Sequence, residues 1–136
     1  MSRILIVDDE PDILLMLRLN LEADGHEVLM AADGEKALER IEAEAPELVV
    51  LDVMMPVLDG WGVLERLQRR DDAPPVVVVS AKVGGDDVAH AIRLGACEYI
   101  TKPFDPERLS VALVDTLNRT LEEREEHRQA IVGRLH

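Results

Sequence analysis

The chain has little of three things: cysteine, basic side chains and long apolar runs. Its one cysteine, Cys97, excludes an internal disulfide, fits a reducing compartment such as the cytoplasm, and is expected to be a small buried thiol. Fifteen Lys and Arg against 28 Asp and Glu give a formal charge of -13, which opposes direct binding to nucleic acid. No apolar run approaches the length of a membrane span, and Met1-Ser2-Arg3 leads straight into a strand pattern without a signal peptide. We therefore expect a cytoplasmic protein that contacts neither nucleic acid nor membrane.

Short apolar runs of strand type alternate with amphipathic helical patterns along the first 120 residues. The strands are expected to begin near Ile4, Val28, Leu48, Val76 and Glu98. The helices are expected at 11–23, 35–44, 60–69 and 86–94, with a last one that begins at Asp105-Pro106. This strict alternation predicts a (βα)5 fold in the α/β class, a doubly wound five-stranded parallel sheet with helices on both faces.

The C-terminal stretch, residues 121–136, differs from the rest because its first half is almost wholly charged. High helix propensity and the pairs Glu125–Arg128 and Glu123–His127 predict a charged helical extension of the last helix, or the start of a linker, after a domain of residues 1–120. Two alternatives stay open for this stretch. It is either a solvated helix that frays toward His136 or a coiled-coil strand with an incomplete apolar 4-3 spacing.

Polar side chains follow four of the expected strands, at the point where each strand ends. They are Asp8 with Asp9, then Asp52, Ser80 and Lys102. In an open parallel sheet these strand ends share one edge, and ligands bind at that edge. Each residue alone has an ordinary explanation as a turn or cap residue. Chance is a poor explanation for the whole set, because clustered like charges need compensation.

These residue types suit phosphoryl chemistry with a divalent cation. The carboxylates of Asp8, Asp9 and Asp52 suit a hard ion that seeks oxygen, Mg²⁺ or Mn²⁺. Asp52 is then a carboxylate nucleophile able to form an acyl phosphate. Lys102 is expected to be a mobile point charge at the exposed edge, paired with Asp52 or with an added phosphoryl group. Ser80 can donate a hydrogen bond to a phosphoryl oxygen.

Four segments together closely resemble bacterial two-component response-regulator receiver domains. They are Ile6–Glu10, Leu51–Gly60, Ser80-Ala81 and Thr101–Phe104, and the resemblance covers roughly residues 1 to 120 in order and spacing. It implies a flavodoxin-like sheet with strand order 2-1-3-4-5, as in chemotaxis regulators. It also implies a signalling switch in which Asp52 accepts a phosphoryl group from a sensor histidine kinase or a histidine phosphotransfer protein.

The resemblance further assigns the metal ligands and one peptide isomer. Mg²⁺ would be held by Asp9, Asp52 and the backbone carbonyl of Met54, with Asp8 acting largely through water. A cis Lys102–Pro103 bond would aim the lysine side chain into the site, and the cis isomer is reasonable there because the bond precedes proline.

The switch is implied by two further positions. Ser80 and Tyr99 occupy the places of the switch hydroxyl and the switch aromatic of receiver domains. Phosphorylation would draw Ser80 toward the phosphate and let Tyr99 turn inward. The surface of the fourth helix, fifth strand and fifth helix would then change, as far as the phosphoryl group interacts differently with the two states.

One departure from the family concerns dimerisation. DNA-binding receivers that dimerise through that surface carry arginines along the last helix, where this chain has Ala112 and Val114. Their salt-bridged dimer is therefore not expected here. A second apolar stripe, Val111, Val114 and Leu121, instead indicates a homodimer through the last helix or another partner. Scattered surface apolar residues are the alternative.

Two rival functions stay open. A Mg²⁺-dependent phosphohydrolase also uses a strand-end Asp, but it usually needs a second acid two residues later, where this chain has Met54. A receiver-like scaffold that is not controlled by phosphorylation usually lacks a site residue, and none is missing here. We expect no enzyme beyond self-phosphotransfer and autodephosphorylation. The chain is expected to be a stand-alone receiver or the receiver part of a longer protein.

Overall fold

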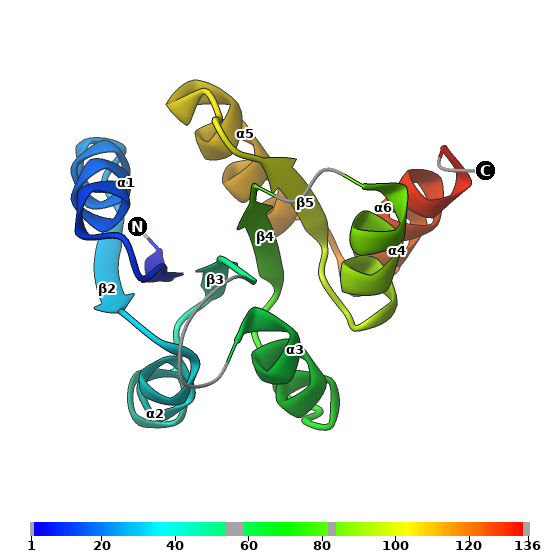
Figure 1. Ribbon diagram of the computed structural model, residues 1–136, viewed down its shortest axis with the longest axis horizontal. Coiled ribbons are helices and arrows are strands. Elements are labelled where there is room, and N and C mark those ends of the chain that lie inside the picture. The colour runs from blue at the N-terminus through cyan, green and yellow to red at the C-terminus, as the bar shows by residue number, and fades with distance from the viewer. Residues whose placement is uncertain (1, 54–58, 82–83, 135–136) are drawn as a thin grey trace.

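The computed structural model describes residues 2–53, 59–81 and 84–134, and over these residues strands and helices alternate as expected (Figure 1). The strands are β1 Arg3–Val7, β2 Glu27–Ala31, β3 Leu48–Leu51, β4 Val76–Ser80 and β5 Glu98–Thr101. The helices are α1 Pro11–Ala23, α2 Gly34–Glu44, α3 Gly60–Gln68, α4 Gly85–Arg93, α5 Pro106–Asn118 and α6 Leu121–Gly133. The predicted bounds of the first four helices agree with these to within one residue.

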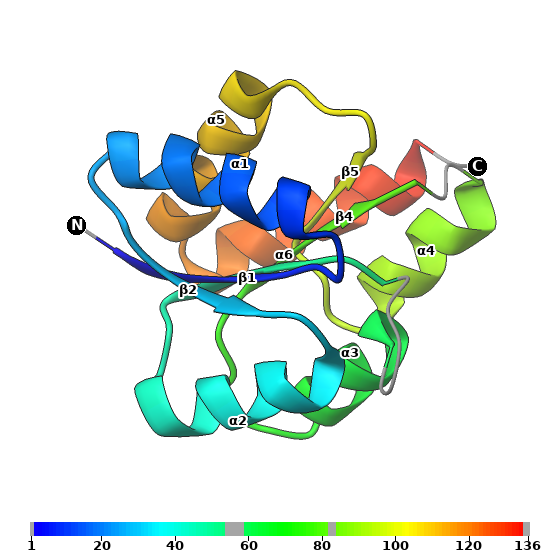
Figure 2. The same ribbon diagram turned by 60° about the vertical axis from the view of Figure 1, so that its left-hand side comes forward.

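All five strands are parallel and lie in the order β2-β1-β3-β4-β5, which confirms the predicted fold class. Helices α1 and α5 cover one face of the sheet, and α2 and α3 lie on the other (Figure 2). Alternate residues of each strand therefore enter different cores. In β1, Ile4 and Ile6 pack with α1 and α5, whereas Leu5 and Val7 pack with α2 and α3.

The two cores explain why the central strands read as continuous apolar runs. All four residues of β3 and all five of β4 are buried, including the run Val76–Val79. A strand that is buried on both faces has no solvent side, so a polar residue at alternate positions would lie in a core. Hydrophobic burial of this kind stabilises the fold by roughly 1.5–3 kcal/mol for each large apolar side chain.

Capping residues mark where three of the helices begin or end, close to the predicted positions. The carboxylate of Asp59 accepts a hydrogen bond from the amide of Gly62 (3.0 Å) and caps α3. The carboxylate of Asp105 does the same for α5, through the amide of Glu107 (2.9 Å). Gly95 has φ +108°, a left-handed conformation that favours glycine directly after α4.

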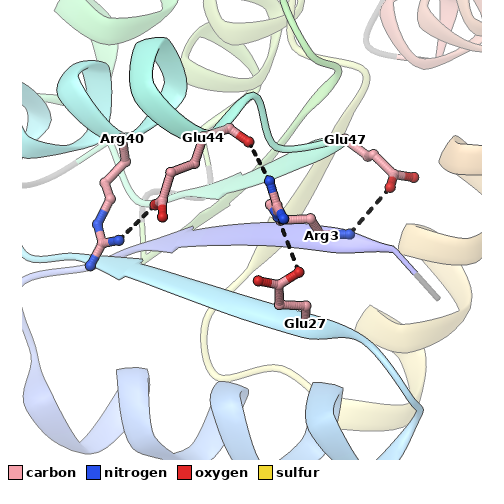
Figure 3. Close-up of polar contacts among 5 residues, drawn as sticks. All are labelled: Arg3, Glu27, Arg40, Glu44 and Glu47. Atoms are coloured by element: carbon pink, nitrogen blue, oxygen red, sulfur yellow. Dashed lines mark hydrogen bonds and ion pairs between the residues drawn. The ribbon is translucent and has the colours of Figure 1, made fainter.

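A polar network ties the amino ends of the strands together, at the edge opposite the site residues (Figure 3). The Arg3 guanidinium contacts Glu27 (3.1 Å) and donates to the carbonyl of Glu44 at the end of α2 (2.8 Å). Arg40 pairs with the Glu44 carboxylate (2.6 Å). The side chains of these two ion pairs are 35–47% exposed, so each pair adds only about 0–1 kcal/mol.

The C-terminal stretch differs from the predicted extension of the last helix. Helix α5 ends at Asn118, Arg119 is extended (φ −79°, ψ 142°), and Thr120 begins a separate helix, α6. The cause is a capping box, in which the Thr120 hydroxyl accepts from the amide of Glu123 and the Glu123 carboxylate accepts from the amide of Thr120. Residues 135–136, where fraying was expected, lie outside the described residues.

The surface pairs predicted in this stretch are half right. Glu125 and Arg128 form an ion pair (2.5 Å), as predicted. His127 does not pair with Glu123, which is part of the cap; it contacts Glu98 of β5 instead (2.6 Å). Helix α6 therefore folds back onto the domain. Among the helices of the described residues, none is long and apolar enough to cross a membrane.

Candidate functional site

The sheet ladder itself brings the site residues together. The amide of Asp52, just after β3, donates to the carbonyl of Val7 at the end of β1 (3.0 Å). The amide of Lys102, just after β5, donates to the carbonyl of Ser80 at the end of β4 (2.8 Å). The amide of Asp8, just after β1, donates to the carbonyl of Ala31 at the end of β2 (3.2 Å). The ends of all five strands thus lie at one edge, as in open parallel sheets that bind ligands there.

Lys102 lies between two buried carboxylates. Its Nζ is 2.7 Å from Oδ2 of Asp8 and 3.1 Å from Oδ2 of Asp52, and Oε1 of Glu10 is 3.8 Å away. Asp8 and Asp52 are 3% and 4% exposed, and the Lys102 side chain is 13% exposed. The lysine is therefore more enclosed than the exposed edge position that the sequence led us to expect. The Lys102–Pro103 bond is cis, the isomer that the resemblance implied.

The charge state of Lys102 follows from these contacts. Burial by itself lowers the pKa of a lysine, because it disfavours the charged form. The hydrogen bonds and negative charges of Asp8 and Asp52 outweigh that cost and raise the pKa of Lys102 above its ordinary value. The Lys102 side chain is therefore a charged ammonium at neutral pH. It lies close enough to Asp52 to pair with negative charge added to that carboxylate.

A cluster of carboxylates beside this ammonium has the chemistry of a divalent-cation site. Among the residues that the structure describes, donor oxygens of Asp8, Asp9 and Glu10 lie within 4.8 Å of one another. Asp8 is buried, and the other two are exposed. Hard oxygen donors at the mouth of a site fit Mg²⁺, which keeps several of its waters. Met54, whose carbonyl was an expected ligand, lies outside the described residues.

Glu10 is the member of this cluster that sequence reasoning missed. It follows the acid pair directly and ends the first segment of the resemblance, but it was given no role as a metal ligand. In the structure Glu10 is the N-cap of α1, and its side chain makes no cap hydrogen bond. Its amide instead donates to Oδ1 of Asp8 (2.9 Å). The signal was present, because a third acid beside a cation-binding pair adds an oxygen donor at the same place.

Ser80 and Tyr99 meet beneath the site. Ser80 is fully buried, and Tyr99 is 7% exposed, so the aromatic ring is turned into the protein in this structure. Burial raises the pKa of Tyr99, a hydrogen bond with the Ser80 side chain offsets part of the rise, and the charges of Asp87 and Asp52 add to it. The hydroxyl of Ser80 and the ring of Tyr99 are therefore physically linked.

A close backbone approach holds the start of α3 against Asp52 and Val53. A Cβ atom built on Gly60, the first residue of α3, would lie 2.4 Å from Cα of Val53 and 2.6 Å from the carbonyl oxygen of Asp52. Only glycine fits there without a backbone shift. The amide of Gly60 also donates to the carbonyl of Val53 (3.1 Å). Sequence reasoning gave Gly60 as a helix start and as the end of the motif that carries Asp52, but it did not predict this close approach.

Comparison with known proteins identifies the class that this sheet and this edge define. The profile of the response regulator receiver domain matches residues 4–114. The chain therefore belongs to the response regulator receiver domain family, as the sequence resemblance predicted.

Individual relatives agree with that assignment. The chain is 41% identical over 119 residues to the alkaline phosphatase synthesis transcriptional regulatory protein PhoP of Bacillus subtilis, covering 88% of this chain and 50% of that protein. It is 44% identical over 119 residues to the probable transcriptional regulator ycf27 of Cyanophora paradoxa, covering 88% and 49%. The chain thus spans about half the length of the curated relatives it matches.

Solved structures show the same fold. The receiver domain of the Francisella response regulator 1452 has a TM-score of 0.84 at 28% identity, covering 88% of this chain and 98% of that chain. A CheY-like receiver domain protein from Methanospirillum hungatei has a TM-score of 0.82 at 30% identity, covering 93% and 98%. Receiver domains of this family support phosphorylation-based signalling as the general function of this chain.

Proposed function

We propose that this chain is a phosphorylation-dependent switch of a two-component system, with Asp52 as the phosphoacceptor. The donor is a phosphohistidine of a sensor histidine kinase or of a histidine phosphotransfer protein. One observation carries the proposal: the buried carboxylate of Asp52 lies 3.1 Å from the Lys102 ammonium, which also holds Asp8, beside exposed carboxylates of metal-ligand type. The single cysteine supports the cytoplasm as its compartment.

The transfer step uses groups of this chain. A carboxylate oxygen of Asp52 attacks the phosphorus, the new O–P bond forms as the N–P bond of the phosphohistidine breaks, and the imidazole leaves. The ammonium of Lys102 then lies where it can pair with the added phosphoryl oxygens. The hydroxyl of Ser80 can donate a hydrogen bond to one of them.

The proposed metal ligands are Asp9, Asp52 and the carbonyl of Met54, with Asp8 acting through water. The structure adds Glu10 to the carboxylates that lie close enough to contribute. When bound, Mg²⁺ would neutralise charge on the phosphoryl oxygens during transfer. Without such compensation the carboxylates would repel the incoming phosphate and slow its transfer to Asp52.

The output follows from the link between Ser80 and Tyr99. A phosphoryl group on Asp52 competes for the Ser80 hydroxyl, which now bonds with Tyr99. The competition changes the environment of the ring and with it the surface of α4, β5 and α5. Phosphorylation can shift the equilibrium between the two conformations of this surface only as far as the phosphoryl group interacts more favourably with one of them.

A homodimer is the proposed readout. Val111 and Val114 of α5 are 59% and 43% exposed, but Leu121, the third member of the predicted stripe, lies on the separate helix α6. Light scattering with and without beryllofluoride should show a rise in mass for the wild type, and Val114→Glu should reduce it. Equal monomer mass in every sample would leave this stripe to a different partner.

Acetyl phosphate with Mg²⁺, followed by intact mass, tests the proposal. The wild type and the control Asp71→Asn, an exposed acid in a loop, should each gain one phosphoryl group. Asp52→Asn should gain none, and chelation of Mg²⁺ should suppress the reaction in all samples. Full labelling of Asp52→Asn would refute Asp52 as the acceptor. No adduct in the wild type with any donor would favour the scaffold alternative.

A further inference from the structure

Helix α6 lies against α4 on one side of the molecule (Figure 1). Five of its residues are partly buried, and they form one stripe at helical spacing. They are Arg124, His127, Arg128, Ile131 and Val132. The last two pack against the core cluster on the α2 and α3 face, yet no side chain of α6 is fully buried. The helix therefore contacts the domain through one shallow, mostly polar face.

Arg128 is the centre of this contact. Its Nε donates to the carbonyl of Ala96 (3.1 Å), and its Nη2 donates to the carbonyl of Ile92. These carbonyls lie at and just beyond the C-terminal end of α4, where the helix dipole favours a cation. The guanidinium thus adds a charged donor to the Ile92 carbonyl, which also accepts from the amide of Gly95 (3.0 Å).

Two further contacts join α6 to β5 and α5. Nε2 of His127 is 2.6 Å from Oε2 of Glu98, which directly precedes Tyr99 in β5. Nε of Arg124 donates to the carbonyl of Thr116 in α5 (3.0 Å). With Arg128 on α4, the helix bridges all three elements of the surface through which the proposed output acts.

The construction of α6 allows it to leave as a unit. Arg119 alone, in an extended conformation, separates α5 from the Thr120 cap. The capping box and the pairs that Glu125 makes with Arg128 and Gln129 stabilise the helix without help from the domain. Docking therefore depends on the shallow packing of Ile131 and Val132 and on a few hydrogen bonds to charged groups. Each of these bonds is worth about 1.5–3 kcal/mol before ordering costs.

We propose that α6 is a detachable cover of the α4, β5 and α5 surface, and that a partner reaches this surface only when α6 has moved away. The occupant in this structure is α6 itself. A competing partner must present the same chemistry, a helix with an arginine toward the end of α4 and a basic side chain toward Glu98. The cover contacts α4, β5 and α5 through Arg128, His127 and Arg124, so its movement can be tested apart from phosphorylation.

The single thiol of Cys97 reports on this movement in the full chain. It is 7% exposed and lines a cavity of about 260 Å³ together with Arg124 and Arg128 of α6. Labelling by a maleimide is followed by intact mass for wild type, Arg128→Met and the control Arg134→Met. Arg134 is exposed, and its Nε donates to the carbonyl of Ala130 in its own helix (3.3 Å).

The expected result is a labelling rate about tenfold higher in Arg128→Met, because two hydrogen bonds to a charged group are lost. The control should stay within about twofold of the wild type, as surface substitutions usually do. Hydrogen exchange should show faster exchange of the α6 amides in Arg128→Met, with β3 and β4 unchanged. Unchanged labelling, or exchange in β3 and β4 that rises together with α6, would overturn the proposal.

A peptide of residues 119–134 tests the surface beneath. Its affinity should be higher for the full chain with Arg128→Met than for the wild type, in which the cover is closed. The same peptide carrying Arg128→Met should bind neither, because it lacks the group that meets the end of α4. Equal affinity of the unaltered peptide for both chains, or none for either, would show that this surface does not accept a helix in exchange for α6.

Discussion

Replacing Lys102 by methionine would leave two buried carboxylates without their cation. The substitution keeps the apolar stem but removes an ammonium that lies 2.7 Å from Asp8 and 3.1 Å from Asp52. Loss of one partner of a buried ion pair costs about 3–5 kcal/mol, since the remaining charge stays buried. The site opens at the sheet edge, so we expect the lower end, about 3 kcal/mol. For a domain of this size that corresponds to roughly 10 °C in Tm.

A divalent cation should reverse much of this loss, because it replaces the missing positive charge beside the carboxylates. Thermal unfolding by circular dichroism in chelator and in Mg²⁺ is the assay. We expect Mg²⁺ to raise the Tm of Lys102→Met by more than that of the wild type. Lys36→Met is the control, because Lys36 is an exposed lysine on α2 and its loss changes the net charge equally. An equal loss of Tm in both variants, or no recovery with Mg²⁺, would refute the reasoning.

The pH dependence of the same contribution has a definite sign. The folded-state pKa of Lys102 is raised above its ordinary 10.5, as burial is outweighed by hydrogen bonds and charge from Asp8 and Asp52. Its stabilising contribution is therefore fully present below 10.5 and is lost as the pH rises through the folded-state pKa. The stability difference between wild type and Lys102→Met should narrow only in strongly alkaline solution.

Two other changes follow from single close observations. Gly60→Ala should cost about 1–3 kcal/mol in urea unfolding, because its Cβ would meet the backbone of Val53, and it should slow phosphorylation of Asp52. Gly133→Ala, where nothing lies within 4 Å, should be neutral or stabilising, and equal costs for both would contradict the steric argument. Burial raises the pKa of Cys97 above 9.0, so its alkylation rate should rise with pH around a midpoint above 9.0, and a midpoint at or below 9.0 would contradict this.

Much of the fold follows from local patterns in the chain. The run Val76–Val79 predicts a strand buried on both faces, and it is buried on both. Asp59 and Asp105 predict helix starts, and both cap helices. Helix caps and apolar runs depend on a few neighbouring residues, so they can be predicted without the rest of the structure. Polar residues at strand ends also predict which residues share an edge, because parallel strands bring these ends together.

Other features depend on groups that the chain brings together from far apart. Nothing near Arg128 in the sequence indicates that it reaches the carbonyl of Ile92, 36 residues earlier. The charged pattern of α6 predicts a helix but not the surface it covers, because polar side chains pair with whatever partner the fold supplies. The partner of His127 was missed for the same reason.

At the acidic site, the sequence predicts which residues meet, and the tertiary structure decides how they are arranged. Sequence order alone placed Asp8, Asp52 and Lys102 at one edge, because each follows a strand of a parallel sheet. Only the tertiary structure shows Lys102 enclosed between the two carboxylates, and Tyr99 turned inward against Ser80. Enclosure and orientation depend on packing around the whole edge, whereas the periodicity of a chain records only which residues are neighbours along each element.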